Sequence, residues 1–177
     1  ISALLNVVEA HLAVRLFKVS KSEFYIFIAA GIGVLFMGTI YGVLIGIILS
    51  FVAMILKATN PPRAFLGMVP GKSGYYDFGK NRFAYPIRNV LIYRFSEDMF
   101  FANIKVLQND SENADKDDTK AVIIDAEAVN SIDFTAADAI EMLSGSLEKR
   151  GSRFYMTGDM HGINVQMRHL GVGHLID

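Results

Sequence analysis

The sequence contains no cysteine and no tryptophan, and only four of its 177 residues are proline. Without cysteine the chain has neither a disulfide framework nor a thiolate zinc site. It also lacks an excess of either charge, because 17 basic residues stand against 18 acidic ones. A basic footprint for nucleic acid is therefore absent, and we expect no nucleic-acid partner. Apolar residues are abundant, at 52% of the chain with a mean hydropathy of +0.34.

The apolar residues concentrate in one run from Phe24 to Leu56, which holds no Asp, Glu, Lys or Arg. As a single helix these 33 residues would extend about 50 Å, well beyond the roughly 30 Å hydrocarbon core of a bilayer. We therefore expect a two-span hairpin over 24–56 that turns near Gly38, with the lipid bilayer as its partner. Basic residues flank both ends, which places both flanks in the cytoplasm of a multi-pass protein of the cell membrane.

Two further patterns accompany the hairpin. Small residues recur every four positions and would lie on one helix face, where another helix can approach closely; they are Gly38, Gly42, Gly46 and Ser50. This stripe of small residues has two possible roles, which are ordinary packing between helices and a sliding or dimer surface. Residues 1–17 have helical apolar spacing, which fits the end of an earlier membrane helix or an interfacial helix. We assign 1–58 to the membrane segment.

A proline- and glycine-rich stretch follows, beginning with Pro61 and Pro62. Proline removes a backbone donor and disfavours helix at the residue before it, so the membrane helix should end here. We interpret 59–82 as a linker and 83–177 as a cytoplasmic domain.

Short apolar runs alternate with helical segments in this domain, which predicts an α/β fold with a mainly parallel sheet and helices packed on it. The acidic stretch 109–120 is expected to form a mobile loop. The expected strands are 83–87, paired as a hairpin with 90–95, then 121–125 and 152–157, and the expected helices are 100–108, 136–149 and 163–170.

The helix expected at 136–149 has a candidate start signal. Thr135 and Asp138 form a near-capping box, in which the threonine hydroxyl accepts a backbone hydrogen bond and the acid lies at the positive helix end. Asp125 and Asp133 are expected to anchor loops at the ends of neighbouring elements.

No catalytic constellation is apparent. The four histidines lack metal-site spacing, and the Gly71-Lys72-Ser73 triplet lacks the glycine that a phosphate-binding loop needs five residues earlier. We expect no enzyme activity, no metal and no cofactor.

The segment VIIDAEAVNSIDFTAADAIEML resembles the STAS domain signature, in which a buried strand ending in Asp precedes a loop, an Asp-x-Thr/Ser-Ala turn and a helix. Its signature-loop residues here are Asp125, Ser131, Asp133, Thr135 and Asp138. The order of the segments along the chain resembles the C-terminal part of SulP inorganic anion transporters. These segments are the hydrophobic hairpin, the Pro-Pro stretch, LGMVPGKSGYYDF, the opening segment NVLIYRFSEDMFFANI and the signature itself.

This resemblance implies the last helices of a gate domain followed by a cytoplasmic STAS domain that serves assembly or regulation. The whole protein would be a homodimeric secondary transporter of sulfate, bicarbonate, chloride or dicarboxylate, with its substrate site in a core domain outside these residues. In stand-alone STAS proteins the hydroxyl at the position of Thr135 is phosphorylated, so regulatory phosphorylation and simple helix capping are both open here. The alternative function is a membrane-tethered STAS module that binds a cytoplasmic signalling partner and transports nothing.

Overall fold

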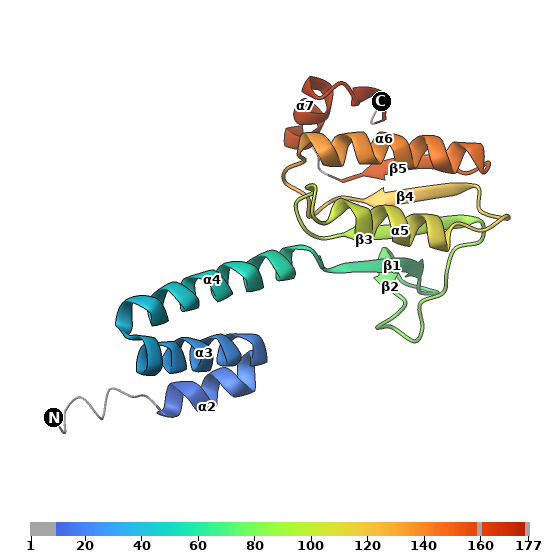
Figure 1. Ribbon diagram of the computed structural model, residues 1–177. Helices are drawn as coiled ribbons and strands as arrows, with labels where there is room; N and C mark the ends of the chain where they lie inside the picture. Colours follow the sequence, from blue (N-terminus) through green and yellow to red (C-terminus); the bar gives the residue numbers. More distant parts are fainter. Residues whose placement is uncertain (1–9, 159–160, 176–177) are drawn as a thin grey trace. The chain divides into compact units, whose positions relative to one another are not determined.

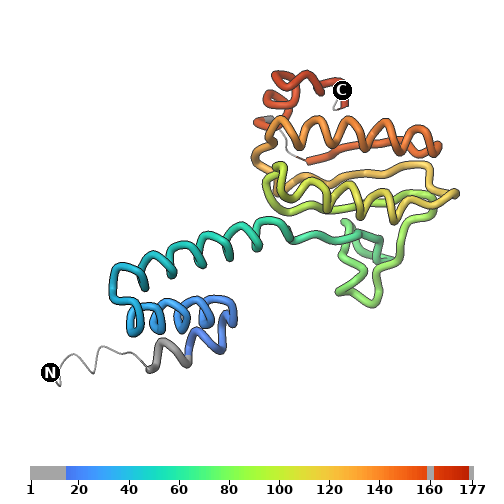
Figure 2. The backbone as a smooth tube through the Cα atoms, viewed as in Figure 1, coloured from blue at the N-terminus to red at the C-terminus, as the bar shows by residue number. Residues whose placement is uncertain are grey.

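The computed structural model describes the backbone of residues 10–158 and 161–175. The chain separates into two compact units, Ile1–Lys57 and Ala58–Asp177 (Figures 1 and 2). The first nine residues, which include most of the amphipathic stretch expected over 1–17, lie outside the described part.

The first unit is helical, with α2 (Ala10–Val19), α3 (Lys21–Met37) and α4 (Thr39–Ala58). The long apolar run is broken at Gly38, as its length required. Gly38 has a φ of 89°, which an L side chain rarely adopts, and its amide closes α3 by donating to the carbonyl of Val34 at 3.1 Å. Within the described residues, α4 alone is long and apolar enough to cross a membrane by length and composition. Its 20 residues correspond to about 30 Å.

Two small residues of α4 lie against α3. A Cβ atom added to Gly42 would come within 2.7 Å of the Cα of Val34, and one added to Gly46 would lie 3.2 Å from the Cβ of Ala30. The backbones therefore approach too closely at Gly42 for any side chain. Ser50, which continues the stripe, lines a shallow apolar groove beside Gly46 and Met54.

The second unit contains a five-stranded sheet in the order β2-β1-β3-β4-β5 (Figure 1). The strands are β1 (Arg63–Met68), β2 (Tyr75–Asp77), β3 (Val90–Phe95), β4 (Ala121–Asp125) and β5 (Arg153–Thr157). β3, β4 and β5 are mutually parallel, as expected for strands joined by helices. β1 is antiparallel to both β2 and β3, so the sheet as a whole is mixed.

Helices α5 (Ile104–Ala114) and α6 (Phe134–Lys149) connect the parallel strands and lie side by side over one face of the sheet (Figure 1). The hydrophobic core lies between these helices and the sheet. Its side chains are at most 1% exposed for Tyr93, Phe95, Leu107, Ile124 and Leu147. Two short elements follow β5, namely α7 (His161–His169) and the 3-10 turn η1 (Gly173–Leu175).

The interpretation of 59–82 as a linker is wrong for its central part, because β1 and β2 both lie inside it. β1 also takes the place expected for 83–87 beside β3, pairing Arg63 with Phe95 and Leu66 with Ile92. Residues 83–87 contribute only isolated bridges, from Tyr85 to Met68 and from Ile87 to Val90. The prolines end α4, but the apolar residues after them are free to form a strand.

The expected loop over 109–120 is also corrected, since α5 continues to Ala114. The polar and charged composition of this stretch favours disorder, but contacts with residues far away in the sequence stabilise its first part as helix. The side chain of Leu107 in this helix is fully buried, and Asp110 bonds to two residues of the sheet. The helix expected over 100–108 also begins four residues later, at Ile104. The remaining strands and helices expected in this unit agree with the structure within two residues.

Candidate functional site

The loop that joins β4 to α6 is held chiefly by one carboxylate. Asp98, just beyond the end of β3, accepts hydrogen bonds at Oδ1 from the backbone N–H groups of Asn130 (2.9 Å) and Ser131 (3.1 Å). Partial burial raises the pKa of Asp98, but the hydrogen bonds from Asn130 and Ser131 outweigh it, so the net pKa is lowered. The loop is thus fixed around an ionised aspartate.

Asp133 performs the capping role at the start of α6. Its Oδ1 accepts from the backbone N–H of Ala136 at 2.7 Å, and its Oδ2 accepts from the backbone N–H of Phe101 at 2.9 Å. One carboxylate therefore satisfies a free helix donor and also connects α6 to the segment before α5.

The expected capping role of Thr135 is consequently wrong. The N-cap of α6 is Asp133, and Thr135 is the second residue of the helix, with an exposed side chain. Asp138 is the fifth residue of α6, beyond its first turn, and is also exposed. Because α6 begins two residues earlier than expected, the cap moves from the threonine to the aspartate.

Asp125, the last residue of β4, forms an ion pair with Arg94. Its Oδ2 lies 2.8 Å from Arg94 on the neighbouring strand β3, and its Oδ1 accepts from the backbone N–H of Glu127 at 3.2 Å. The pairing of Arg94 with Asp125 follows directly from the parallel register. Its charge is therefore largely balanced within the sheet.

The sequence analysis missed three residues that fix this loop. Besides Asp98, these are Asn103, which is fully buried and donates to the Asp98 carbonyl at 2.8 Å, and Gln166 of α7, whose Oε1 accepts from the Ile132 N–H at 3.0 Å. Asp98 could have been found, because the carboxyl ends of parallel strands meet at one edge of the sheet. Gln166 carries no such signal in the sequence.

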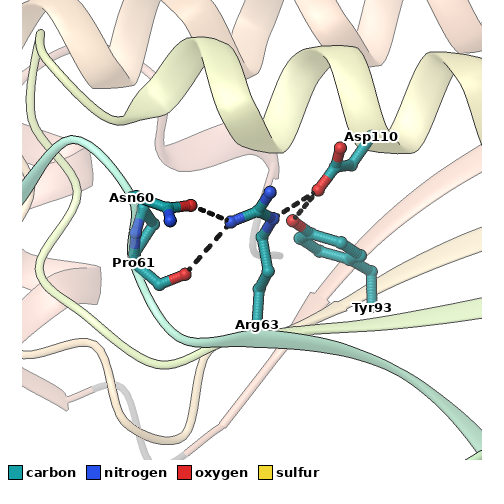
Figure 3. A network of polar contacts seen from close by, with 5 residues as sticks. All are labelled: Asn60, Pro61, Arg63, Tyr93 and Asp110. Carbon is teal, nitrogen blue, oxygen red and sulfur yellow. Dashed lines mark hydrogen bonds and ion pairs between the residues drawn. The ribbon is translucent and has the colours of Figure 1, made fainter. Parts of the chain in front are cut away.

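A second polar cluster lies where β1 begins, five residues after α4 (Figure 3). The Arg63 Nε atom lies 2.7 Å from Asp110 Oδ2, and its Nη1 donates to Asn60 Oδ1 at 2.6 Å and to the Pro61 carbonyl at 3.3 Å. The Tyr93 hydroxyl donates to the same Asp110 oxygen at 2.7 Å. Together these bonds tie the segment that follows α4 to α5.

The buried tyrosine in this cluster acts as a fixed donor. Burial raises the pKa of Tyr93 far above its usual value, the Asp110 carboxylate raises it further, and Arg63 lowers it slightly. Tyr93 therefore remains protonated at any physiological pH and continues to donate to Asp110.

Both clusters lie at one end of the sheet. Arg63 pairs with Phe95, so the start of β1 adjoins the carboxyl end of β3, from which Asp98 follows. The same end holds the start of α6, because Met99 bridges to Ile132 and Asp133 bonds to Phe101. The signature loop and the start of β1, which follows α4 in the chain, thus lie at the same end of the sheet.

Comparisons with known proteins identify the family of this chain and its relatives. Residues 84–176 match the STAS domain family. A probable sulfate transporter of Arabidopsis thaliana is 29% identical over 161 residues, which cover 85% of this chain and 25% of that protein. A probable sulfate transporter of Mycobacterium tuberculosis is 28% identical over 157 residues, covering 87% of this chain and 28% of its own length.

Among solved structures, the murine Solute Carrier 26 family member A9 anion transporter in the inward-facing state superimposes with a TM-score of 0.81 at 19% identity, covering 96% of this chain and 27% of that chain. The chain spans about a quarter of the length of the relatives it matches. It belongs to the STAS domain family, and over most of its length it is homologous to the C-terminal region of the SulP/SLC26 sulfate transporters.

Proposed function

We propose that this chain is the C-terminal part of a secondary anion transporter of the sulfate, bicarbonate, chloride or dicarboxylate class. In this proposal α3 and α4 are the last helices of the gate domain in the cell membrane. The STAS domain lies in the cytoplasm and serves assembly or regulation of a homodimer. Substrate ligands belong to parts of the transporter outside these residues.

The joining of an apolar helical hairpin to a STAS sheet in one chain carries this proposal. The relatives named as sulfate transporters match across both parts rather than across the STAS domain alone, since the matches cover 85–87% of the chain. A cytoplasmic STAS protein would need no helix like α4, which has 20 residues and one basic residue, Lys57, at its end.

A regulatory role of the signature loop is supported by the exposure of Thr135. Its hydroxyl does not cap α6, so it is free to accept a phosphate. Like-charge repulsion from Asp125 is reduced by Arg94, although Asp133 would still oppose the phosphate. We propose that phosphorylation at Thr135 modulates transport by adding charge at the sheet edge that adjoins the entry from α4.

The size of the parent polypeptide is the first test. An antibody raised against residues 85–177 is used on fractionated native cells. A membrane band several times larger than 19.6 kDa supports the transporter and leads to uptake assays with radiolabelled sulfate, chloride, bicarbonate and dicarboxylate. A membrane band near 20 kDa contradicts it and favours the tethered regulator that binds a signalling partner.

The regulatory role is tested in the intact transporter with Thr135→Ala and Thr135→Glu. We expect the two variants to be equally stable but to differ in uptake rate or in binding of cytoplasmic partners. Equal uptake and equal partner binding for both variants would remove the regulatory assignment without affecting the transporter proposal.

A further inference from the structure

A cavity of about 500 Å³ opens at the amino end of the parallel strands. It lies where residues 88–90 lead into β3, whereas the signature loop follows the carboxyl ends of β3 and β4. Asp125, Asp133 and Thr135 do not line this cavity, so it is a separate feature of the domain. Its volume is within the range that small organic ligands occupy.

Two aromatic rings line the cavity. Phe65 of β1 and Phe78, which follows β2, lie with their ring planes 23° apart and their centroids 6.2 Å apart. Phe65 is held in place by the edge of the Tyr93 ring, whose centroid lies 5.0 Å away. Phe78 is 38% exposed. The two nearly parallel rings therefore offer an apolar surface on which a flat ligand ring can stack with an offset.

A close approach of the backbone supplies more of the apolar lining, which includes Pro86, Ile87 and Leu91. The segment that carries Pro86 can pass close to β1 because residue 67 is glycine. A Cβ atom added to Gly67 would collide with the backbone carbonyl of Tyr85. Tyr85 is also fixed by two backbone hydrogen bonds to β1, each of 2.9 Å. This wall of the cavity is therefore set by the backbone.

Two exposed cations, Arg88 and Lys116, also line the cavity, and each belongs to a turn closed by hydrogen bonds. Beside Arg88, Asn89 has a φ of 62°, which asparagine tolerates better than most residues, and its side-chain amide donates to the Asp118 carbonyl. Lys116 begins a turn in which the Thr119 N–H donates to the Lys116 carbonyl at 2.8 Å. Both turns are therefore ordered without a ligand.

The charge of the lining favours one kind of anion. The ion pairs of the described residues involve other cations, so the charges of Arg88 and Lys116 are not neutralised by a carboxylate. Asp118 lines the cavity as well, and two cations with one carboxylate give a formal net charge of +1. The carboxyl end of α5, at Ala114, adds a partial negative charge. A monovalent carboxylate therefore suits the cavity better than a phosphate group, which carries nearly two charges.

We infer that this cavity binds an aryl carboxylate of one or two fused rings. The ring system lies against Phe65 and Phe78, and the carboxylate is attracted by Arg88 and Lys116. The inference goes beyond the proposed function and does not depend on it. All the residues that carry it belong to the second unit, so it holds for a transporter and for a tethered regulator alike.

The test is a titration of the full chain in phosphatidylcholine nanodiscs with 2-naphthoate, followed by methyl NMR. Ile87 and Leu91 line the cavity and are the reporters, whereas Leu143 and Leu147, which are buried in α6, are the internal controls. Because shifts are read at identified methyl groups, partition of the probe into lipid does not imitate binding. A probe of this size should bind with a Kd on the order of 1 mM.

We expect saturable shifts at Ile87 and Leu91 and unchanged positions for the control methyl groups. The double variant Arg88→Gln/Lys116→Gln should weaken binding about tenfold, since one exposed ion pair contributes up to about fivefold. The control Lys105→Gln/Lys149→Gln removes the same charge at exposed positions outside the cavity and should leave the Kd unchanged. Neutral 2-naphthamide should bind the unaltered chain about tenfold more weakly than 2-naphthoate.

The absence of saturable shifts at Ile87 and Leu91 would overturn the cavity as a binding site. Equal affinity for 2-naphthamide, or tighter binding of 2-naphthyl phosphate, would overturn the carboxylate assignment, and both comparisons use the unaltered chain. An equal loss of affinity in the two double variants would indicate unspecific charge attraction and also overturn the inference. The size of the parent polypeptide tests the transporter separately, so failure of either proposal leaves the other intact.

Discussion

Replacing Asp133 by alanine is the most direct test of how the signature loop is built. The change removes two charge-assisted hydrogen bonds, one from Ala136 at 2.7 Å and one from Phe101 at 2.9 Å. Loss of an N-cap costs about 0.5–2 kcal/mol. The second bond adds about 1 kcal/mol, because the Phe101 amide is close to solvent and regains water. We expect a total loss of about 2 kcal/mol from the unfolding free energy of the second unit.

The measurement is thermal unfolding of the full chain in detergent, followed by the near-ultraviolet dichroism of its tyrosines. For a domain of this size about 2 kcal/mol corresponds to a fall in Tm of roughly 8 °C. Asp133→Asn keeps the cap and should lose about half as much. Thr135→Ala is the matched control and should change stability by less than about 0.5 kcal/mol, since the threonine is exposed and alanine favours helix. Comparable losses for Thr135→Ala and Asp133→Ala would refute the assignment of the cap.

Three further outcomes follow from the structure. Gly42→Leu should separate α3 from α4 and lower thermal stability in detergent, whereas Gly31→Ala, where an added Cβ meets nothing within 4 Å, should be neutral or stabilising. Tyr93→Phe should cost about 1.5 kcal/mol in urea unfolding by removing the donor to Asp110, and an unchanged midpoint would contradict the role of that bond. The pKa of Asp98 is lowered in the folded state, so its carboxylate stabilises the folded domain fully above the ordinary pKa of 3.8, and this stabilisation is lost as the pH falls through the folded pKa. In Asp98→Asn the unfolding free energy should therefore fall less steeply with decreasing pH in the acid range.

Local patterns predicted the parallel half of the sheet well. Ala121–Asp125 is a continuous apolar run ending in a carboxylate, and it is β4 with the bounds expected. Bilayer thickness required a break in the apolar run, and the residues around Gly38 indicated where it lies. These features depend on short-range periodicity and on length, both of which are visible in one sequence.

The antiparallel edge could not be predicted in the same way. β1 follows two prolines and contains Gly67, so its composition indicates a linker, and only its pairing with β3 makes it a strand. α5 is likewise extended past its apolar residues by the bonds of Asp110 to Arg63 and Tyr93, which are 47 and 17 residues away. The N-cap of α6 was predicted at Thr135 instead of Asp133. Both side chains carry an oxygen that can accept a backbone hydrogen bond, so an error of two residues in the start of the helix moves the cap from one to the other.

The position of β1 has a practical consequence for producing the cytoplasmic domain alone. The family match begins at residue 84, yet the sheet begins at Arg63. A fragment cut at 84 would lose β1 and β2, leaving the hydrogen-bonding edge of β3 bare and uncovering Ile92, which is only 4% exposed in the whole chain. Such an edge invites pairing with other copies and precipitation. A fragment that starts at Thr59 keeps the edge covered and retains Asn60 for Arg63.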